Sequence, residues 1–206
     1  MIKNLLFDLG GVIMDIRREN CIESFKRLGM EDPGQFLGEY VQAGPFGALE
    51  SGQITSGELR SELRKYLPAS TTDEQIDSAF GDFLIGIPRH RLEQLRELRK
   101  KYKIYLLSNT NPIMWGNGIA KAFRQEGGEI TDYFDGMVKS FEAGVMKPAP
   151  EIFNQVVSKF GIRPEETVFI DDSASNTRAA EALGFKTVTV APGTEFADLL
   201  AIELAD

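Results

Sequence analysis

The chain has 206 residues, of which 42% are hydrophobic and 26% charged, the balance of a folded globular protein. Its net charge of −8 argues against nucleic-acid binding, which requires clustered lysine and arginine. No apolar run is long enough to cross a bilayer, and the N-terminal run is interrupted by Asp8, so we expect neither a membrane partner nor a secretory signal. Cys21 is the only cysteine and cannot form an internal disulfide, which agrees with a cytoplasmic location.

The first half of the chain begins with one short strand and then becomes helical. Residues 5–7 form an apolar run that ends at Asp8, and Gly10 and Gly11 then permit a tight turn. Up to Pro88 the apolar spacing predicts four short helices. The first two carry the apolar groups Ile22, Phe25, Leu28 and Phe36, Leu37, Tyr40, Val41. The other two begin at the expected capping boxes Thr55 with Glu58 and Thr72 with Gln75.

After Pro88 the pattern changes to alternating helices and strands, which is typical of a parallel sheet. Helices are predicted around Leu92 to Leu98, from Ile152 to Phe160 and over residues 174–183. Strands are predicted at 104–107, 168–170 and 187–190, with a weaker one at 138–141. We therefore predict an α/β fold: a doubly wound, Rossmann-like catalytic core of residues 1–14 and 89–206, with residues 15–88 inserted as a small helical cap.

Polar residues suited to phosphoryl transfer follow the predicted strands at one edge of this sheet: Asp8, Ser108, Asn109, Lys147, Asp171 and Asp172. Paired carboxylates suit Mg²⁺, Ser108 and nearby backbone N–H groups can bind phosphate oxygens, and Lys147 supplies positive charge. Asp8 could attack phosphorus and form an aspartyl-phosphate. Each residue alone has an ordinary structural explanation, such as a helix N-cap for Asp172. The combination, in this order, is what indicates the chemistry.

These motifs resemble those of the haloacid dehalogenase superfamily, most closely its sugar-phosphatase branch, which includes glucose-1-phosphate phosphatases. The resemblance rests on FDLGGVI at residues 7–13, LSNTN at 107–111, MKP at 146–148 and FIDD at 169–172. It implies that Asp8 is the nucleophile and a ligand of Mg²⁺, and that the backbone carbonyl of Gly10 is a second ligand. Asp172 would bind the metal directly, and Asp171 directly or through water.

The same resemblance implies the rest of the site. Ser108 and Lys147, counted with Asp8 as catalytic, would hold the transferring phosphoryl group together with Asn109, and Asn176 would support the loop after the acid pair. The implied substrate is a small phosphoester, specifically a sugar phosphate.

The sequence departs from that family at Gly10, where most of its phosphatases carry an aspartate that protonates the leaving group and later activates water. General acid-base groups contribute about 10²–10⁴ in rate, so another residue substitutes here or turnover is slow. Asp15 and Glu50 are candidates for the substitute. Trp115 could line the leaving-group pocket, although apolar packing is its more ordinary role, and His90 is expected to have no catalytic role.

Three other functions share part of this pattern. A haloacid dehalogenase also uses an aspartate nucleophile, but family dehalogenases carry an aromatic residue at the position of Gly10 and lack the paired acids Asp171 and Asp172. A phosphorylated receiver switch has its acid pair after the first strand, whereas here the pair comes late in the chain. A weakly catalytic protein that binds a phosphorylated ligand is the third alternative, favoured by the missing acid.

Overall fold

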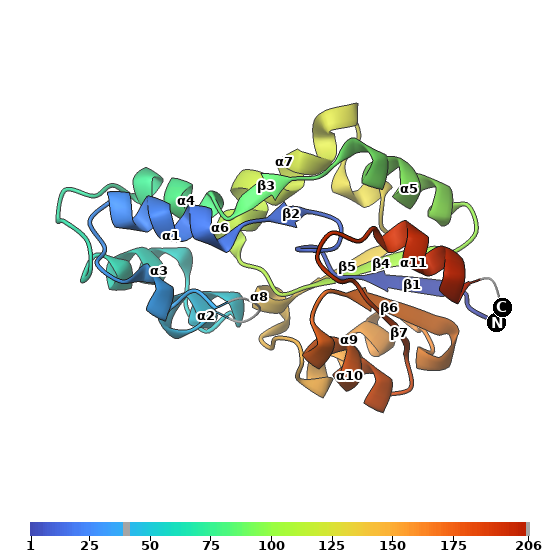
Figure 1. Ribbon diagram of the computed structural model, residues 1–206. Helices are drawn as coiled ribbons and strands as arrows, with labels where there is room; N and C mark the ends of the chain where they lie inside the picture. Colours follow the sequence, from blue (N-terminus) through green and yellow to red (C-terminus); the bar gives the residue numbers. More distant parts are fainter. Residues whose placement is uncertain (39–41, 205–206) are drawn as a thin grey trace.

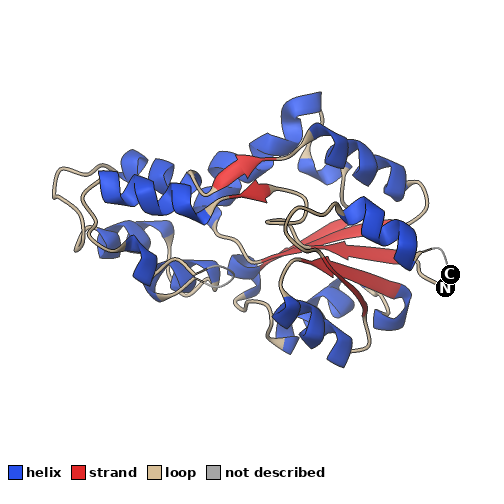
Figure 2. Cartoon of the chain, viewed as in Figure 1, coloured by secondary structure: helices blue, strands red, loops and turns tan. Residues whose placement is uncertain are grey.

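The computed structural model describes residues 1–38 and 42–204, apart from the side chain of residue 126. Figure 1 shows two parts: a core built on one central sheet, and a smaller group of helices at one end of it. The secondary-structure colouring of Figure 2 shows that the larger part is a sheet layered between helices. None of the helices in the described ranges is long and apolar enough to cross a membrane.

The central sheet has five strands in the order β5-β4-β1-β6-β7, and all four neighbouring pairs are parallel. The strands are β1 (Asn4–Phe7), β4 (Lys103–Ser108), β5 (Gly136–Lys139), β6 (Thr167–Asp171) and β7 (Lys186–Thr189). After β1, the chain adds β4 and β5 on one side of β1 and then β6 and β7 on its other side. The carboxyl ends of β1 and β6 therefore flank a topological switch point, where ligands bind in such folds.

Both faces of the sheet are apolar, as the continuous apolar runs predict. Leu6 and Phe169 point to the layer formed by α9 (Pro150–Phe160) and α10 (Ala174–Ala182). Their neighbours Leu5 and Val168 join a second cluster on the other face, with α5 (Arg89–Arg99) and α11 (Phe196–Glu203). This arrangement confirms the predicted doubly wound α/β core.

The inserted part contains α1 (Arg18–Arg27), the 3₁₀ turn η1 (Pro33–Gln35), α2 (Gly44–Glu50), α3 (Ser56–Leu63) and α4 (Asp73–Gly81). Both predicted capping boxes are present at the starts of α3 and α4. The second predicted helix was misplaced: Phe36 and Leu37 follow η1, while Tyr40 and Val41 lie outside the described residues. Helix α2 instead forms downstream, where Phe46 packs edge-on against Phe25 and Phe80.

Two short strands that the sequence did not reveal connect the parts. β2 (Asp15–Ile16) and β3 (Leu84–Gly86) pair antiparallel where the chain leaves the core and where it returns. Strands of two and three residues are too short to show a period. The proposed boundaries at 14/15 and 88/89 lie beside this ribbon and remain predictions as limits of independent units.

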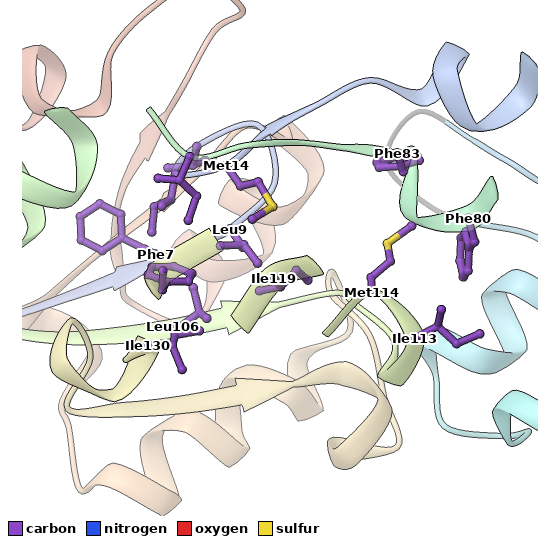
Figure 3. Close-up of a cluster of buried hydrophobic side chains, with 14 of the residues drawn as sticks. Phe7, Leu9, Met14, Phe80, Phe83, Leu106, Ile113, Met114, Ile119 and Ile130 are labelled. Atoms are coloured by element: carbon purple, nitrogen blue, oxygen red, sulfur yellow. The ribbon is translucent and has the colours of Figure 1, made fainter. Parts of the chain in front are cut away.

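The remaining elements are short. The weaker strand predicted at residues 138–141 is only partly correct, because residues 138 and 139 belong to β5 and residues 140 and 141 to α8 (Ser140–Ala143). A run of short turns follows β4: α6 (Pro112–Met114), the π-turn η2 (Trp115–Ile119), α7 (Ala120–Ala122) and the 3₁₀ turns η3 (Phe123–Glu126) and η4 (Ile130–Asp132). The 3₁₀ turn η5 (Pro164–Glu166) precedes β6. Figure 3 shows that side chains from this run, such as Met114 and Ile119, join the core to the inserted helices in one apolar cluster.

Candidate active site

Three carboxylates meet at the switch point of the sheet. The register pairs Phe7 with Ile170, and the Asp8 N–H donates to the Ile170 carbonyl at 2.8 Å, so Asp8 stands beside the end of β6. Asp8, Asp171 and Asp172 each offer an oxygen within 4.8 Å of the others. Such a group of hard oxygen ligands suits a divalent cation like Mg²⁺.

Lys147 lies between two of these carboxylates. Its Nζ is 2.7 Å from Asp8 Oδ1 and 2.7 Å from Asp171 Oδ2, and it donates to the Leu107 carbonyl at 3.0 Å. Burial disfavours its charge, but the carboxylates of Asp171 and Asp8 outweigh this effect and raise the pKa of Lys147. All three ammonium protons therefore have acceptors, and the lysine is the fixed counter-ion of the site.

The Asp8 carboxyl is buried, and this burial raises its pKa to about 7. Lys147 opposes the rise, whereas repulsion from Asp171 and Asp172 adds to it. A bound cation would favour the ionised carboxylate, which is the form that can attack phosphorus.

Asp171 and Asp172 have different surroundings. Asp171 is fully buried, and its Oδ1 accepts from the Ser173 N–H at 2.8 Å and from Asn176 Nδ2 at 2.9 Å. Asp172 lines the cavity above the switch point, and Asp171 is not part of that lining. Asp172 therefore faces the cavity, whereas Asp171 is engaged with Lys147, Ser173 and Asn176. The role expected of Asn176, to support the loop after the acid pair, stays a prediction.

Ser108 and Asn109, at the end of β4, have separate roles in the geometry. Ser108 is buried and lines the cavity, where its hydroxyl makes only a long contact of 3.4 Å with the Asn109 carbonyl. The Asn109 amide donates to the Lys147 carbonyl at 3.0 Å and accepts from the Lys147 N–H at 2.9 Å. The Asn109 side chain thus fixes the lysine loop, which the sequence motif alone did not indicate.

The two glycines after Asp8 are explained by their neighbours. Gly11 has a φ of +74°, and a Cβ there would lie 2.2 Å from Asp172 Oδ2. Gly10 does not have a positive φ, but a Cβ there would lie 3.2 Å from Ile16 Cδ1. Ile16 therefore occupies the space beside Gly10, in which the family's usual aspartate would stand.

The cavity above Asp8 is enclosed by both parts of the molecule. Its apolar walls include Leu9, Met14 and Ile119 from the core, with Ile16 and Phe83 from the connecting segments. Figure 3 shows several of these side chains in the shared apolar cluster. Both parts of the molecule therefore contribute apolar side chains to the lining.

Of the two candidate substitutes for the missing acid, only Glu50 reaches this cavity. Glu50 is buried at the end of α2. Gln42, which also belongs to the inserted part, lines the same cavity. Asp15 does not line the cavity, because its carboxylate is 2.8 Å from Arg91 and half-exposed. Sequence reasoning missed Gln42, since a glutamine without a motif carries no signal.

The other singled-out residues lie outside the cavity. The amine of Lys139 lies 4.6 Å from the centre of the Trp115 ring, and neither residue lines the cavity. His90 is paired with Glu195 at 3.1 Å on the surface of the core. Cys21 is buried in the apolar cluster. These positions agree with packing and surface roles.

The comparisons with known proteins decide the family. A family model described as haloacid dehalogenase-like hydrolase matches residues 2–184. The chain belongs to this family. It is 37% identical over 204 residues to a D-ribitol-5-phosphate phosphatase from Bacteroides thetaiotaomicron, and the match covers 99% of each chain.

Solved structures give the same result. A HAD family enzyme from Bacteroides thetaiotaomicron, in complex with magnesium and inorganic phosphate, is 42% identical with a TM-score of 0.90. That match covers 97% of this chain and 99% of the other. An L-2-haloacid dehalogenase from Xanthobacter autotrophicus is 21% identical with a TM-score of 0.62, covering 100% of this chain and 83% of the other, and shows the fold alone.

These findings confirm the predicted superfamily and the predicted enzyme class, a phosphoric monoester hydrolase. They also separate the alternatives. The acid pair stands at the end of β6, the fourth strand of the core in chain order, and this position differs from that in a receiver domain. The paired acids Asp171 and Asp172, which we expect a dehalogenase to lack, both lie close to Asp8.

Proposed function

We propose that this protein is a cytoplasmic, Mg²⁺-dependent phosphatase that hydrolyses a small sugar or polyol phosphate through an aspartyl-phosphate on Asp8. The observation that carries the proposal is the cluster of Asp8, Asp171 and Asp172 around the buried Lys147. Three carboxylates against one ammonium leave an excess of negative charge, which a divalent cation would balance. Asp8, Asp172 and the Gly10 carbonyl would hold Mg²⁺, with Asp171 acting through water.

The residues of the chain then divide the reaction into two displacements. An Asp8 oxygen attacks phosphorus, the bond from phosphorus to the leaving oxygen breaks, and the leaving oxygen takes a proton from a water molecule to depart as the alcohol. Water then attacks the phosphorus of the aspartyl-phosphate, releasing inorganic phosphate and restoring Asp8. Lys147 and Ser108 would bind the phosphoryl oxygens, while Asn109 and Asn176 hold Lys147 and Asp171 in position. Bound Mg²⁺ would supply further stabilisation of the developing charge.

The relatives support the substrate class. The similar protein named D-ribitol-5-phosphate phosphatase matches over nearly the whole chain, and the similar HAD structure holds magnesium and inorganic phosphate. A small phosphorylated polyol or sugar would fill the enclosed cavity with its leaving group between the apolar walls.

The absence of an acid at Gly10 favours one second candidate, a phospho-ligand-binding protein with little turnover. Purified protein assayed with Mg²⁺ against a panel of phosphate esters, including D-ribitol 5-phosphate, separates the two. Phosphate release that stops after chelation and returns with added Mg²⁺ supports the phosphatase. Tight binding of the esters without release in any assay would favour the binding protein.

A further inference from the structure

We infer that Gln42 and Glu50 form a subsite that recognises hydroxyl groups on the leaving alcohol, so the enzyme selects polyhydroxylated, uncharged leaving groups. This inference rests on the proposed phosphatase function and deepens it. Both residues come from the inserted helical part, and both line the same cavity as Asp8. They face a part of the substrate that the phosphoryl-binding residues do not reach.

Both side chains are buried, and one of them carries an unpaired polar atom. Gln42 is 9% exposed, and its Oε1 has no hydrogen-bond partner among the residues that the structure describes. Glu50 is 6% exposed, and among the described residues no lysine, arginine or histidine forms an ion pair with it. A buried polar atom that stays unpaired is destabilising, so a ligand that satisfies Gln42 Oε1 gains affinity.

The backbone beside both residues is closely packed. A Cβ on Gly47 would lie 2.3 Å from the Gln42 carbonyl oxygen, so the segment at Gln42 packs directly on α2. After α2, Gly52 has a φ of +69°, and a Cβ there would lie 2.3 Å from the Phe141 carbonyl oxygen. The turn that follows Glu50 is therefore seated on α8 of the core, beside which Figure 1 shows α2.

The chemistry of the pair fits hydroxyl groups. Burial raises the pKa of Glu50 to about 8, although the neighbouring Asn111 amide opposes the rise. At neutral pH the Glu50 carboxyl is thus mostly protonated and offers both a donor and an acceptor, while Gln42 Oε1 offers an acceptor. A hydroxyl group can form a hydrogen bond with each of these side chains, because it is both a donor and an acceptor.

The lining does not fit a leaving group with a second negative charge. Lys147 is the only basic residue among the described residues that line the cavity, and it already lies between Asp8 and Asp171. A second phosphate or a carboxylate on the leaving group would find no cation beside Glu50. The apolar side chains Ile16 and Phe83 instead suit the carbon chain of a polyol.

Recognition differs from the role of a replacement acid. The space beside Gly10 is filled by Ile16, which supplies the three atoms nearest to a Cβ built there, at 3.2 to 4.0 Å. Glu50 therefore does not stand in the place of the missing aspartate. The two roles make different predictions for an alkyl phosphate that has no hydroxyl groups but a similarly poor leaving group.

The test compares D-ribitol 5-phosphate with n-pentyl phosphate in the wild type and in the variants Glu50→Leu, Gln42→Leu and Glu50→Gln. We expect each leucine variant to lower the ratio of kcat/KM for ribitol phosphate over pentyl phosphate by about tenfold or more, because a hydrogen-bonding partner is lost. Glu50→Gln should retain most of the ratio, since an amide also donates and accepts. Glu31→Leu, at an exposed position in the same part, is the matched control and should leave the ratio unchanged.

An equal loss of kcat/KM on both esters would overturn the inference, since it would indicate an acid or a structural role for Glu50. A preference for 5-aminopentyl phosphate over ribitol phosphate would also overturn it, by showing a cation site. If no ester is hydrolysed, the proposed function fails instead. The subsite is then tested by calorimetry, where Glu50→Leu and Gln42→Leu must weaken the binding of ribitol 5-phosphate more than that of pentyl phosphate. Circular dichroism confirms the folding of each variant.

Discussion

The two sides of the cavity differ in how completely their polar groups are paired. On the core side, Lys147 has three acceptors, and the Asn109 amide uses both of its ends on the lysine loop. On the side of the inserted helices, within the described part of the chain, Gln42 Oε1 has no partner and Glu50 is buried without a cation. The charged groups of the core side are therefore oriented before a ligand arrives, although the buried hydroxyl of Thr110 in the same lining has no partner among the described residues. On the other side, a leaving group would supply the missing partner of Gln42.

This difference separates chemistry from selectivity. Groups that stabilise a transition state act best when they are already oriented, because no reorganisation is then needed during the reaction. Groups that choose between substrates act through the cost of staying unpaired when the wrong ligand binds. Substitutions on the core side should therefore reduce turnover of every ester. Substitutions on the other side should change which ester is preferred.

The largest effect is expected for Asp8→Asn. The amide has nearly the shape of the carboxyl but cannot attack phosphorus, so turnover should fall by at least about 10³-fold on every ester. Phosphate release measured on D-ribitol 5-phosphate and on an activated aryl phosphate tests this. Thermal unfolding serves as the control, because burial already disfavours the ionised carboxyl and the variant should remain folded. Activity above a few per cent with a native melting curve would contradict the assignment.

Gly11→Ala should be the next most damaging change. The alanine Cβ would collide with the Asp172 carboxylate, and the positive φ is strained for any residue but glycine. We expect kcat/KM to fall by about 10²-fold and the Mg²⁺ concentration for half-maximal activity to rise. A Mg²⁺ titration measures both. Gly193→Ala, another glycine of positive φ with open space around it, controls for backbone strain alone.

Gly10→Asp should increase the rate of hydrolysis more for esters with poor leaving groups than for esters with good ones, provided that Ile16 is replaced by a shorter residue at the same time. The backbone at Gly10 accepts a side chain, but Ile16 Cδ1 stands 3.2 Å from the new Cβ. In the double variant Gly10→Asp with Ile16→Val, we expect kcat/KM to increase by about tenfold or more for alkyl phosphates and to change little for aryl phosphates. A series of leaving-group pKa values measured for this variant and for Ile16→Val alone tests the idea. Equal slopes would show that Gly10 is not the site of a missing acid.

The smallest effect on the enzyme is expected for Glu50→Gln, which should change the pH dependence of the folding stability. The pKa of Glu50 is about 8 in the folded protein and near 4.5 when exposed, so the folded state holds the proton more tightly. The wild type should therefore lose stability as the pH rises from about 5 to 9, by about 2–4 kcal/mol from this group. Glu50→Gln removes that contribution. Urea unfolding at both pH values measures it, and identical pH dependence in the two proteins would contradict the buried, unpaired state of Glu50.

The sequence by itself determined the features that depend on local pattern and order. Continuous apolar runs predict buried parallel strands because both faces of such strands are covered, and residues 5–7 and 168–170 met this description. The capping boxes at Thr55 and Thr72 were predictable because their hydrogen bonds join residues three positions apart. The order of Asp8, Ser108, Lys147 and Asp171 was sufficient to identify the family.

Only the tertiary structure decided which residues share a space. Helix α2 contains two glycines and so depends on the packing of Phe46, which no local pattern reveals. In the sequence, Asp15 and Glu50 are equally good candidates for the missing acid. In the structure, Asp15 pairs with Arg91, which is distant in the chain, whereas Glu50 is buried beside the cavity. The Asn109 amide meets Lys147 through a contact that spans 38 residues. Such contacts bring together groups far apart in the chain, so their geometry exists only after the sheet and the inserted helices have packed.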